Sequence, residues 1–124
     1  MAKILVIEDN DLNMKLFEDM LCLLKCEVIS TKSGYNAIDL CKQYLPDLVL
    51  MDIQLDGISG TDIIRDMKSD KALQDIPIIA ISAYAMKHEE MSILQSGCDK
   101  YLSKPVAIEE FFSSVQHFLD RDTK

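Results

Sequence analysis

One short stretch, Leu48–Met51 followed by Asp52, constrains the fold of this chain more than any other. Four apolar residues in a row, with Pro46 and Asp47 before them and a turn containing Gly57 after them, predict a buried strand. A strand that is apolar on both faces is typical of a parallel sheet covered by helices. Asp52 then lies at the carboxyl edge of the sheet, where open α/β folds bind their ligands. Because packing does not require a carboxylate there, we expect Asp52 to be reactive.

The rest of the chain repeats the pattern of an apolar run followed by an amphipathic segment, five times in all. The apolar runs predict strands at residues 3–7, 27–30, 48–52, 78–82 and 100–103. Helical spacing predicts helices at residues 11–24, 37–45, 87–96 and 108–120, and a further one around Ile63, Ile64 and Met67. Five βα units predict an α/β fold, with a parallel sheet and helices on both of its faces. Residues 1–124 contain no linker, repeat or low-complexity segment and are expected to form one domain.

Local signals refine the helices. Asn10 and Ser59 are expected to cap the first and third helices, and Asp11 is spaced to form an ion pair with Lys15. The last helix carries one apolar column, with two phenylalanines beside it: Ile108, Phe112, Val115 and Leu119 in the column, then Phe111 and Phe118. This additional pair either completes the core or presents an apolar surface to a partner.

Charge and composition exclude several classes of protein. The formal net charge of −8 argues against a nucleic-acid partner, because phosphate binding requires a basic surface. No apolar run is long enough to cross a membrane and no signal peptide precedes the first strand, so the cytoplasm is the expected location. The cysteines are not accompanied by a second Cys or His pair at zinc spacing and are expected to be reduced and mostly buried: Cys22, Cys26, Cys41 and Cys98.

Polar residues end or follow four of the predicted strands: Glu8 and Asp9, Asp52, Ser82, and Lys104. Because parallel strands all point the same way, these five side chains are expected to meet at one edge of the sheet. Three carboxylates in a small space require a compensating cation, and their oxygens suit Mg²⁺. Each residue alone has an ordinary explanation as a capping acid, a strand-end hydroxyl or a solvated lysine. The agreement of four separate strand ends favours a functional site.

The chemistry that this set can perform is transfer of a phosphoryl group to an aspartate, because it combines a carboxylate nucleophile, a metal site, a lysine and a hydroxyl. A Mg²⁺-dependent phosphatase with Asp52 as its nucleophile is the alternative. Against it, Gln54 stands where such an enzyme needs a second acid. A flavodoxin-like cofactor binder is disfavoured because the first loop lacks a glycine or Ser/Thr phosphate cradle.

At these residues the chain resembles the receiver domain of bacterial two-component response regulators. The motifs that carry the resemblance are Glu8-Asp9, Asp52, Ser82-Ala83 and Lys104-Pro105. The resemblance covers essentially the whole chain and implies a doubly wound, flavodoxin-like (CheY-like) sheet of five strands in the order 2-1-3-4-5. Residues 6–17, 47–55 and 83–87 are more specifically similar to single-domain regulators of cell division.

The resemblance also implies a role for each residue at the sheet edge. Asp52 would be the phosphoacceptor and Lys104 its partner, with a cis peptide bond between Lys104 and Pro105. The implied ligands of Mg²⁺, or of Mn²⁺ in its place, are Asp9, Asp52, the backbone carbonyl of Gln54 and, through water, Glu8.

The resemblance further implies a two-state switch. Ser82 would move to bind a phosphoryl oxygen, and Tyr101 would turn inward into the space that this movement vacates. Gln54 and Tyr84 would flank the phosphoryl group and set its lifetime. The chain departs from the family pattern at Glu8, where Asp is commoner, at Asp56-Gly57, where Pro is usual, and at Ala107, which cannot cap the last helix. The Asp-Gly pair predicts a looser loop after the site.

The implied phosphodonor is a histidine kinase/phosphatase or a histidine phosphotransferase, and the implied reader is a downstream signalling protein. Because the chain ends after the fifth helix, we expect no output domain, and a monomer or weak dimer that catalyses only its own phosphorylation and dephosphorylation. The candidate contact surfaces are the first helix near Leu12 and Asn13, and the fourth helix, Tyr101 and last helix together.

Overall fold

The computed structural model describes residues 1–55, 57–83 and 87–122, with the backbone alone for residues 87–89, 121 and 122. It contains one parallel sheet in the order β2-β1-β3-β4-β5, as expected. The strands are β1 (Lys3–Ile7), β2 (Glu27–Thr31), β3 (Leu48–Asp52), β4 (Ile78–Ser82) and β5 (Lys100–Ser103). Every residue of β3 and β4 is buried, which is the burial that their apolar runs predict.

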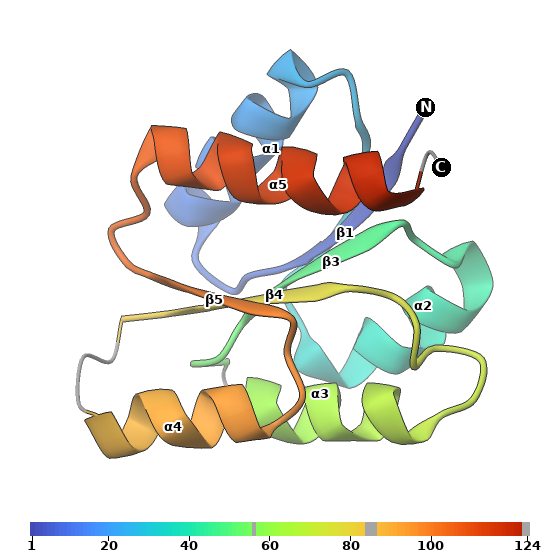
Figure 1. Cartoon of the computed structure of the whole chain (residues 1–124), viewed down its shortest axis with the longest axis vertical. Coiled ribbons are helices and arrows are strands. Elements are labelled where there is room, and N and C mark those ends of the chain that lie inside the picture. The colour runs from blue at the N-terminus through green and yellow to red at the C-terminus, as the bar shows by residue number, and fades with distance from the viewer. Residues whose placement is uncertain (56, 84–86, 123–124) are drawn as a thin grey trace.

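Helices cover both faces of the sheet, with α1 and α5 on one face and α2, α3 and α4 on the other (Figure 1). The helices are α1 (Asp11–Leu23), α2 (Ala37–Tyr44), α3 (Gly60–Ser69), α4 (Lys87–Gln95) and α5 (Ile108–Asp122), with a 3-10 turn η1 (Gly34–Asn36) before α2. Each face therefore has its own apolar core, one beneath α1 and α5 and one beneath α2, α3 and α4. In Figure 1 the end of α5 and the start of β1 lie on the same side of the sheet.

The strand register brings the ends of the strands together. Ile7 of β1 pairs with Met51 of β3, and Asp52 pairs with Ile81 of β4. Ser82, the last residue of β4, is in turn paired with the end of β5. The residues that follow β1 and β5 consequently reach the same edge as Asp52.

The predicted caps are confirmed, but the predicted ion pair is wrong. Asn10 Oδ1 accepts a hydrogen bond from the Asn13 backbone N–H at 3.0 Å, which caps α1. Ser59 likewise caps α3 through the N–H of Thr61. Asp11 instead forms an ion pair with Lys32, from the turn after β2, and Lys15 pairs with Asp19 one turn further along α1. The turn after β2 competes for the Asp11 carboxylate, and the spacing of residues within the helix could not predict that.

The core face of α5 also differs from the expected column. Phe111, Val115 and Phe118 are buried, whereas Ile108 is 58% exposed and Phe112 is half-buried. Phe111 and Phe118, the pair beside the expected column, therefore belong to the core and are not free to bind a partner. Apolar residues spaced three and four apart on α5 form two adjacent faces, one that contains Phe112 and one that contains Phe111. The packing of α5 on α1 buries the face with Phe111.

The cysteines are free but are less buried than expected. Cys41 is buried, Cys26 and Cys98 are half-buried, and Cys22 is exposed on α1. Burial raises the pKa of the Cys41 thiol to about 12, so this thiol stays protonated.

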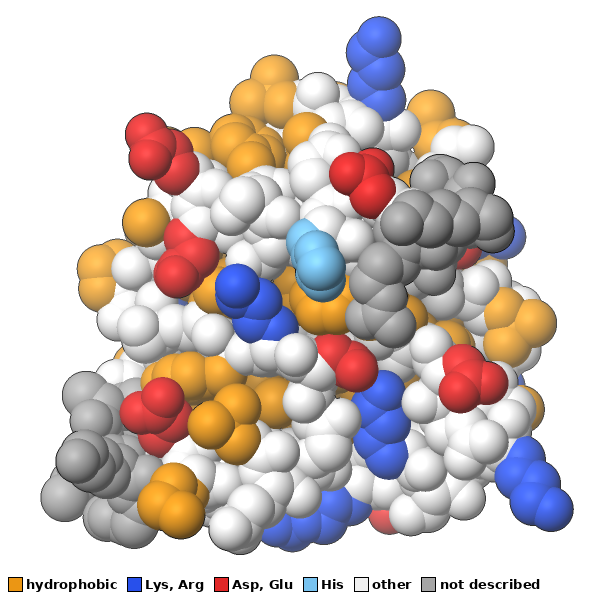
Figure 2. Space-filling model, viewed as in Figure 1, with side chains coloured by type: hydrophobic (Ala, Val, Ile, Leu, Met, Phe, Trp, Pro, Cys, Tyr) orange, Lys and Arg blue, Asp and Glu red, His pale blue; other side chains and the backbone are white. Residues whose placement is uncertain are grey.

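Two further properties of the described structure are the apolar length of its helices and the distribution of its surface charge. Within the described residues no helix combines the length and the apolar character needed to cross a bilayer. Acidic and basic side chains are interspersed over the face shown in Figure 2, so the net charge of −8 does not gather in one block on that face.

Candidate functional site

Three carboxylates meet at the carboxyl edge of the sheet. Glu8 and Asp9 directly follow β1, and Asp52 ends β3. One oxygen from each side chain lies within 4.8 Å of those of the other two. Glu8 and Asp52 are buried, while Asp9 is more open to solvent. The predicted cluster of acids is therefore present.

Lys104 supplies positive charge to this cluster. Its Nζ lies 3.1 Å from Glu8 Oε1 and 3.4 Å from Asp52 Oδ2. Its backbone N–H donates to the carbonyl of Ser82 at 2.9 Å, which ties the end of β5 to the end of β4. The peptide bond between Lys104 and Pro105 is cis, as expected.

Glu8 is the least satisfied of the three acids. Its Oε2 accepts from the backbone N–H of Asn10 at 3.2 Å. Its Oε1 is buried and, among the described residues, has no hydrogen-bond partner; Lys104 is close enough for an ion pair but lacks hydrogen-bond geometry. Burial, followed by the close approach and charge repulsion of the Asp52 carboxylate, raises the pKa of Glu8 from 4.5 to about 7. A bound cation would offset the cost of burying the Glu8 charge and would reduce the repulsion between Glu8 and Asp52.

The donor set fits Mg²⁺. Mg²⁺ binds hard oxygen ligands, is held by one or two protein carboxylates and keeps several of its waters. The cluster offers Asp9 and Asp52 as carboxylates, with Glu8 behind them carrying a buried oxygen that lacks a hydrogen bond. Within the described residues the same positions contain no sulfur or histidine ligand that would favour a softer metal.

The loops after β3 and β4 are linked across the mouth of the site. The Gln54 backbone N–H donates to Asp52 Oδ1 at 3.1 Å, and the Gln54 side-chain oxygen accepts from the Ala83 N–H at 3.1 Å. Ser82 is buried at the end of β4 beside Asp52. Tyr101 is half-buried on β5 and packs against the core beneath α3. The expectations for Tyr84 and Asp56 fall outside the described residues.

Gly60, at the start of α3, was not singled out from the sequence, yet it shapes the site. A Cβ at Gly60 would lie 2.6 Å from the carbonyl oxygen of Asp52 and 2.8 Å from Ile53 Cα. These are backbone atoms of β3 and its extension, so they cannot move aside easily. The first turn of α3 therefore lies directly against Asp52, and only glycine allows this approach.

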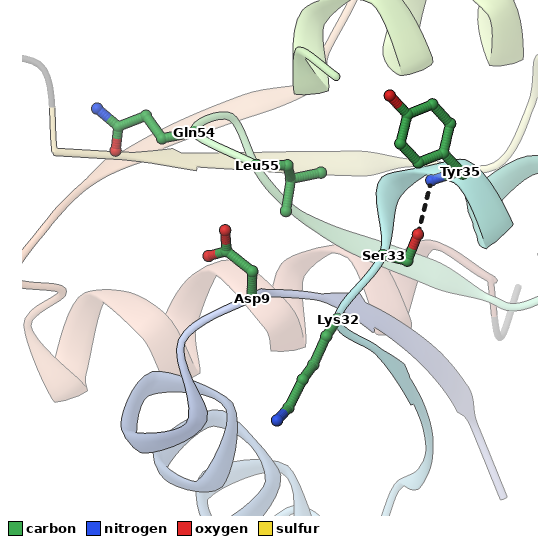
Figure 3. Close-up of a pocket in the computed structure, with 6 residues that line it drawn as sticks. All are labelled: Asp9, Lys32, Ser33, Tyr35, Gln54 and Leu55. Atoms are coloured by element: carbon green, nitrogen blue, oxygen red, sulfur yellow. Dashed lines mark hydrogen bonds between the residues drawn. The ribbon is translucent and has the colours of Figure 1, made fainter. Parts of the chain in front are cut away.

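A hollow of about 600 Å³ opens beside the acids (Figure 3). Asp9, Gln54 and Leu55 line one part of it, and Lys32, Ser33 and Tyr35 line the other. The three residues from the turn after β2 were not predicted as part of the site. The rule that ligands collect at carboxyl ends of strands applies to β2 as well and would have included this turn.

Comparison with known proteins now assigns the family. The response regulator receiver domain family matches residues 4–116, which is most of the chain. The chain therefore belongs to the response regulator receiver domain family.

Within that family, the chain is similar over most of its length to response regulators named DivK. The polar-differentiation response regulator DivK of Brucella ovis is 44% identical over 116 residues, covering 94% of each chain. DivK of Brucella anthropi is 43% identical over the same share of each chain. The more specific resemblance within the family is therefore confirmed at the level of sequence, and the relatives that show it are polar-differentiation regulators named DivK.

Solved structures show the same fold. The receiver domain of the sensor histidine kinase PA1611 from Pseudomonas aeruginosa PAO1 superposes with a TM-score of 0.89 at 29% identity, covering 96% of this chain and 98% of that one. That structure has a magnesium ion coordinated in its active-site cleft. A receiver domain from Francisella has a TM-score of 0.90 at 22% identity, with both chains fully covered, and supports the fold alone.

Proposed function

We propose that this chain is a phosphorelay receiver whose Asp52 accepts a phosphoryl group from a phosphohistidine. The observation that carries the proposal is the meeting of Glu8, Asp9 and Asp52 with Lys104 at the edge of the sheet. The cluster combines a nucleophile, a site for a divalent cation and a fixed positive charge, which are the requirements of phosphoryl transfer.

The residues of the cluster have different roles in the proposed phosphoryl transfer. One carboxylate oxygen of Asp52 forms the bond to phosphorus as the bond between phosphorus and the donor nitrogen breaks. Asp9, Asp52 and the carbonyl of Gln54 hold Mg²⁺, or Mn²⁺, with Glu8 acting through water. When bound, the metal neutralises charge on the phosphoryl oxygens. Lys104, already 3.4 Å from Asp52 Oδ2, stabilises the charge that develops on the transferred group.

The response to phosphorylation is proposed to begin at Ser82 and Tyr101. Ser82 ends the strand next to that of Asp52, so its hydroxyl is placed to donate a hydrogen bond to a phosphoryl oxygen once it turns toward Asp52. Tyr101 lies on β5, next to that strand, and would turn inward in response. Gln54, whose side chain bridges to Ala83 at the mouth, is proposed to set the phosphoryl lifetime together with Tyr84.

The phosphodonor is proposed to dock beside α1. A largely apolar groove of about 370 Å³ runs between this helix and the segment after β5. Its lining includes Leu16, Phe17, Lys104 and Val106. The groove ends at Lys104, which contacts Asp52, so a helix seated there can present a phosphohistidine to the acceptor. A histidine kinase/phosphatase or a histidine phosphotransferase supplies such a helix.

The output is proposed to be protein contact in the control of cell division, in the cytoplasm, by a single-domain regulator that is a monomer or weak dimer. The similarity to DivK of Brucella ovis over 94% of both chains supports this role. The free cysteines are consistent with a reducing compartment. The chain is proposed to catalyse only its own phosphorylation and dephosphorylation, and Gln54 in place of a second acid disfavours the phosphatase alternative.

The test is phosphorylation of the purified protein by acetyl phosphate with Mg²⁺, followed by intact mass spectrometry. The wild type should gain one phosphoryl group, and Asp52→Asn should gain none. Asp39→Asn, a matched change at an exposed position of α2, should behave like the wild type.

Two results would refute this proposal. One is a wild type without an adduct, and the other is an adduct of equal yield on the Asp52→Asn variant. Sustained turnover of added phosphomonoesters would instead favour the phosphatase.

A further inference from the structure

The turn between β2 and α2 is fixed to the strand end beside the acids. Ser33 N–H donates to Thr31 Oγ1 and Tyr35 N–H donates to Ser33 Oγ, both at 3.2 Å. The carbonyl of Thr31 accepts from the N–H of Glu8 at 3.1 Å. These hydrogen bonds fix the backbone of the turn and therefore the position of Tyr35.

The same turn presses against the loop that follows β3. A Cβ at Gly34 would lie 2.6 Å from Ile58 Cγ2 and 2.9 Å from Leu55 Cδ1. Two side chains of the loop thus lie directly against Gly34, and a larger residue at this position would have to displace them. The contact is apolar and leaves the polar backbone of the loop to be held in another way.

Tyr35 supplies the polar contact. Its hydroxyl donates to the carbonyl of Gly57 at 2.8 Å. The Tyr35 side chain is 65% exposed, so burial of its ring does not explain its placement. Gly57 has a φ of +82°, a conformation suited to glycine, and glycine is the residue with the most backbone freedom to lose on ordering. The hydrogen bond from Tyr35 therefore restrains the loop at Gly57, the residue with the greatest backbone freedom.

The restrained loop carries part of the proposed metal site. Its first residues include Gln54, whose N–H orients Asp52 Oδ1 and whose carbonyl is a proposed metal ligand. Figure 3 shows Tyr35 and Gln54 on opposite sides of the hollow beside Asp9. The turn after β2 and the loop after β3 are therefore coupled across the site.

We propose that Tyr35 is a positioning residue that holds the loop after β3 in its metal-binding geometry through the Gly57 carbonyl. The inference rests on the proposed function and adds a residue to which no role in the reaction has been assigned. Fixing a flexible ligand before binding lowers the entropic cost of binding, so the hydroxyl of Tyr35 should strengthen cation affinity without touching the cation.

The first experiment compares Tyr35→Phe with Tyr44→Phe, the same substitution at the far end of α2. Calorimetric titration with Mg²⁺ should give a dissociation constant about two- to tenfold higher for Tyr35→Phe, the range expected for one lost hydrogen bond. The control should match the wild type. Melting temperatures in EDTA should be equal for the two variants, because an exposed hydrogen bond on a loop adds little to global stability.

The second experiment needs no metal. Amide hydrogen exchange measured by NMR in EDTA should be faster at Gln54 and Gly60 in Tyr35→Phe than in Tyr44→Phe, because both N–H groups make hydrogen bonds that secure this loop.

Equal Mg²⁺ affinity and equal exchange in the two variants would overturn the role of Tyr35 while leaving the proposed function intact. Failure of the wild type to bind Mg²⁺ would count against the proposed function. The exchange rates would then still decide whether Tyr35 holds the loop.

Discussion

At the scale of single residues, the buried carboxylate of Glu8 lowers the stability of the metal-free fold. It is 1% exposed, lies against Asp52 and has one oxygen without a hydrogen bond among the described residues. The ion pair with Lys104 does not outweigh this burial, because the pKa of Glu8 is raised. A carboxylate that is buried at a cost in stability, beside two other carboxylates at a strand end, is better explained by binding than by folding.

The first prediction concerns Glu8 and pH. The pKa of Glu8 is about 7 in the folded protein and 4.5 is its ordinary value, so the unfolded chain releases the proton first as pH rises. The free energy of unfolding of the metal-free protein should therefore fall between about pH 4.5 and pH 7. Glu8→Gln removes this titration and should be more stable than the wild type at pH 8 in EDTA, with little difference at pH 5.

Urea unfolding in EDTA across this pH range measures the effect, with Glu27→Gln, at an exposed residue of β2, as the control. A Glu8→Gln variant that is less stable than the wild type at pH 8 would show that the ion pair with Lys104 outweighs burial.

At the scale of elements, the packing of α5 on α1 decides which side of α5 is buried. Phe17 of α1 and Phe111 of α5 stack with their ring planes 6° apart and their centroids 5.5 Å apart. Phe111 is fully buried, and Phe112, its neighbour along α5, is half-buried with its ring edge-on to Phe111. One stacked pair thus fixes the rotation of α5 about its axis.

The second prediction compares these neighbours. Phe111→Ala should lower the free energy of unfolding by about 3–5 kcal/mol, because it removes a buried ring and leaves a cavity. Phe112→Ala should cost clearly less, since solvent already reaches that side chain. Chemical denaturation of both variants measures the difference, and an equal loss would mean that α5 is rotated from the orientation described.

The sequence predicts strands better than helix faces, and the reason is physical. Runs such as Ile78–Ser82 are apolar on both faces and bounded by turn residues, so their limits follow from local chemistry. The buried face of α5 and the partner of Asp11 depend on elements distant in sequence. For the site, strand ends alone predicted the cluster at Asp52. The same rule, applied to β2, would have included the turn that holds Tyr35. It could not have predicted the contact of Tyr35 with Gly57, because that contact exists only once two loops have met.

At the scale of the whole molecule, the groove beside α1 lies next to the acids and is the proposed docking site of the phosphodonor. Leu12 is 78% and Leu16 is 46% exposed on α1, and Leu16 lines the groove. An exposed apolar patch rimmed by polar residues is a common mark of a protein–protein contact site. The proposed docking surface for a protein donor and the proposed site of transfer therefore use different residues.

The third prediction uses that separation. Leu16→Ala should slow phosphoryl transfer from a phosphorylated histidine phosphotransferase domain about tenfold, the loss expected for a moderate interface hot spot. Phosphorylation by acetyl phosphate should be unchanged, because the small donor does not use the groove. Leu23→Ala, at an exposed leucine outside the lining of the groove, is the matched control. Equal transfer rates for the two variants would place the donor elsewhere.

The placement of the two termini has a practical consequence. The end of α5 and the start of β1 lie on the side of the sheet opposite its carboxyl edge (Figure 1). A fluorescent protein, an affinity tag or a surface tether joined at either terminus would stand away from the acids and from the groove.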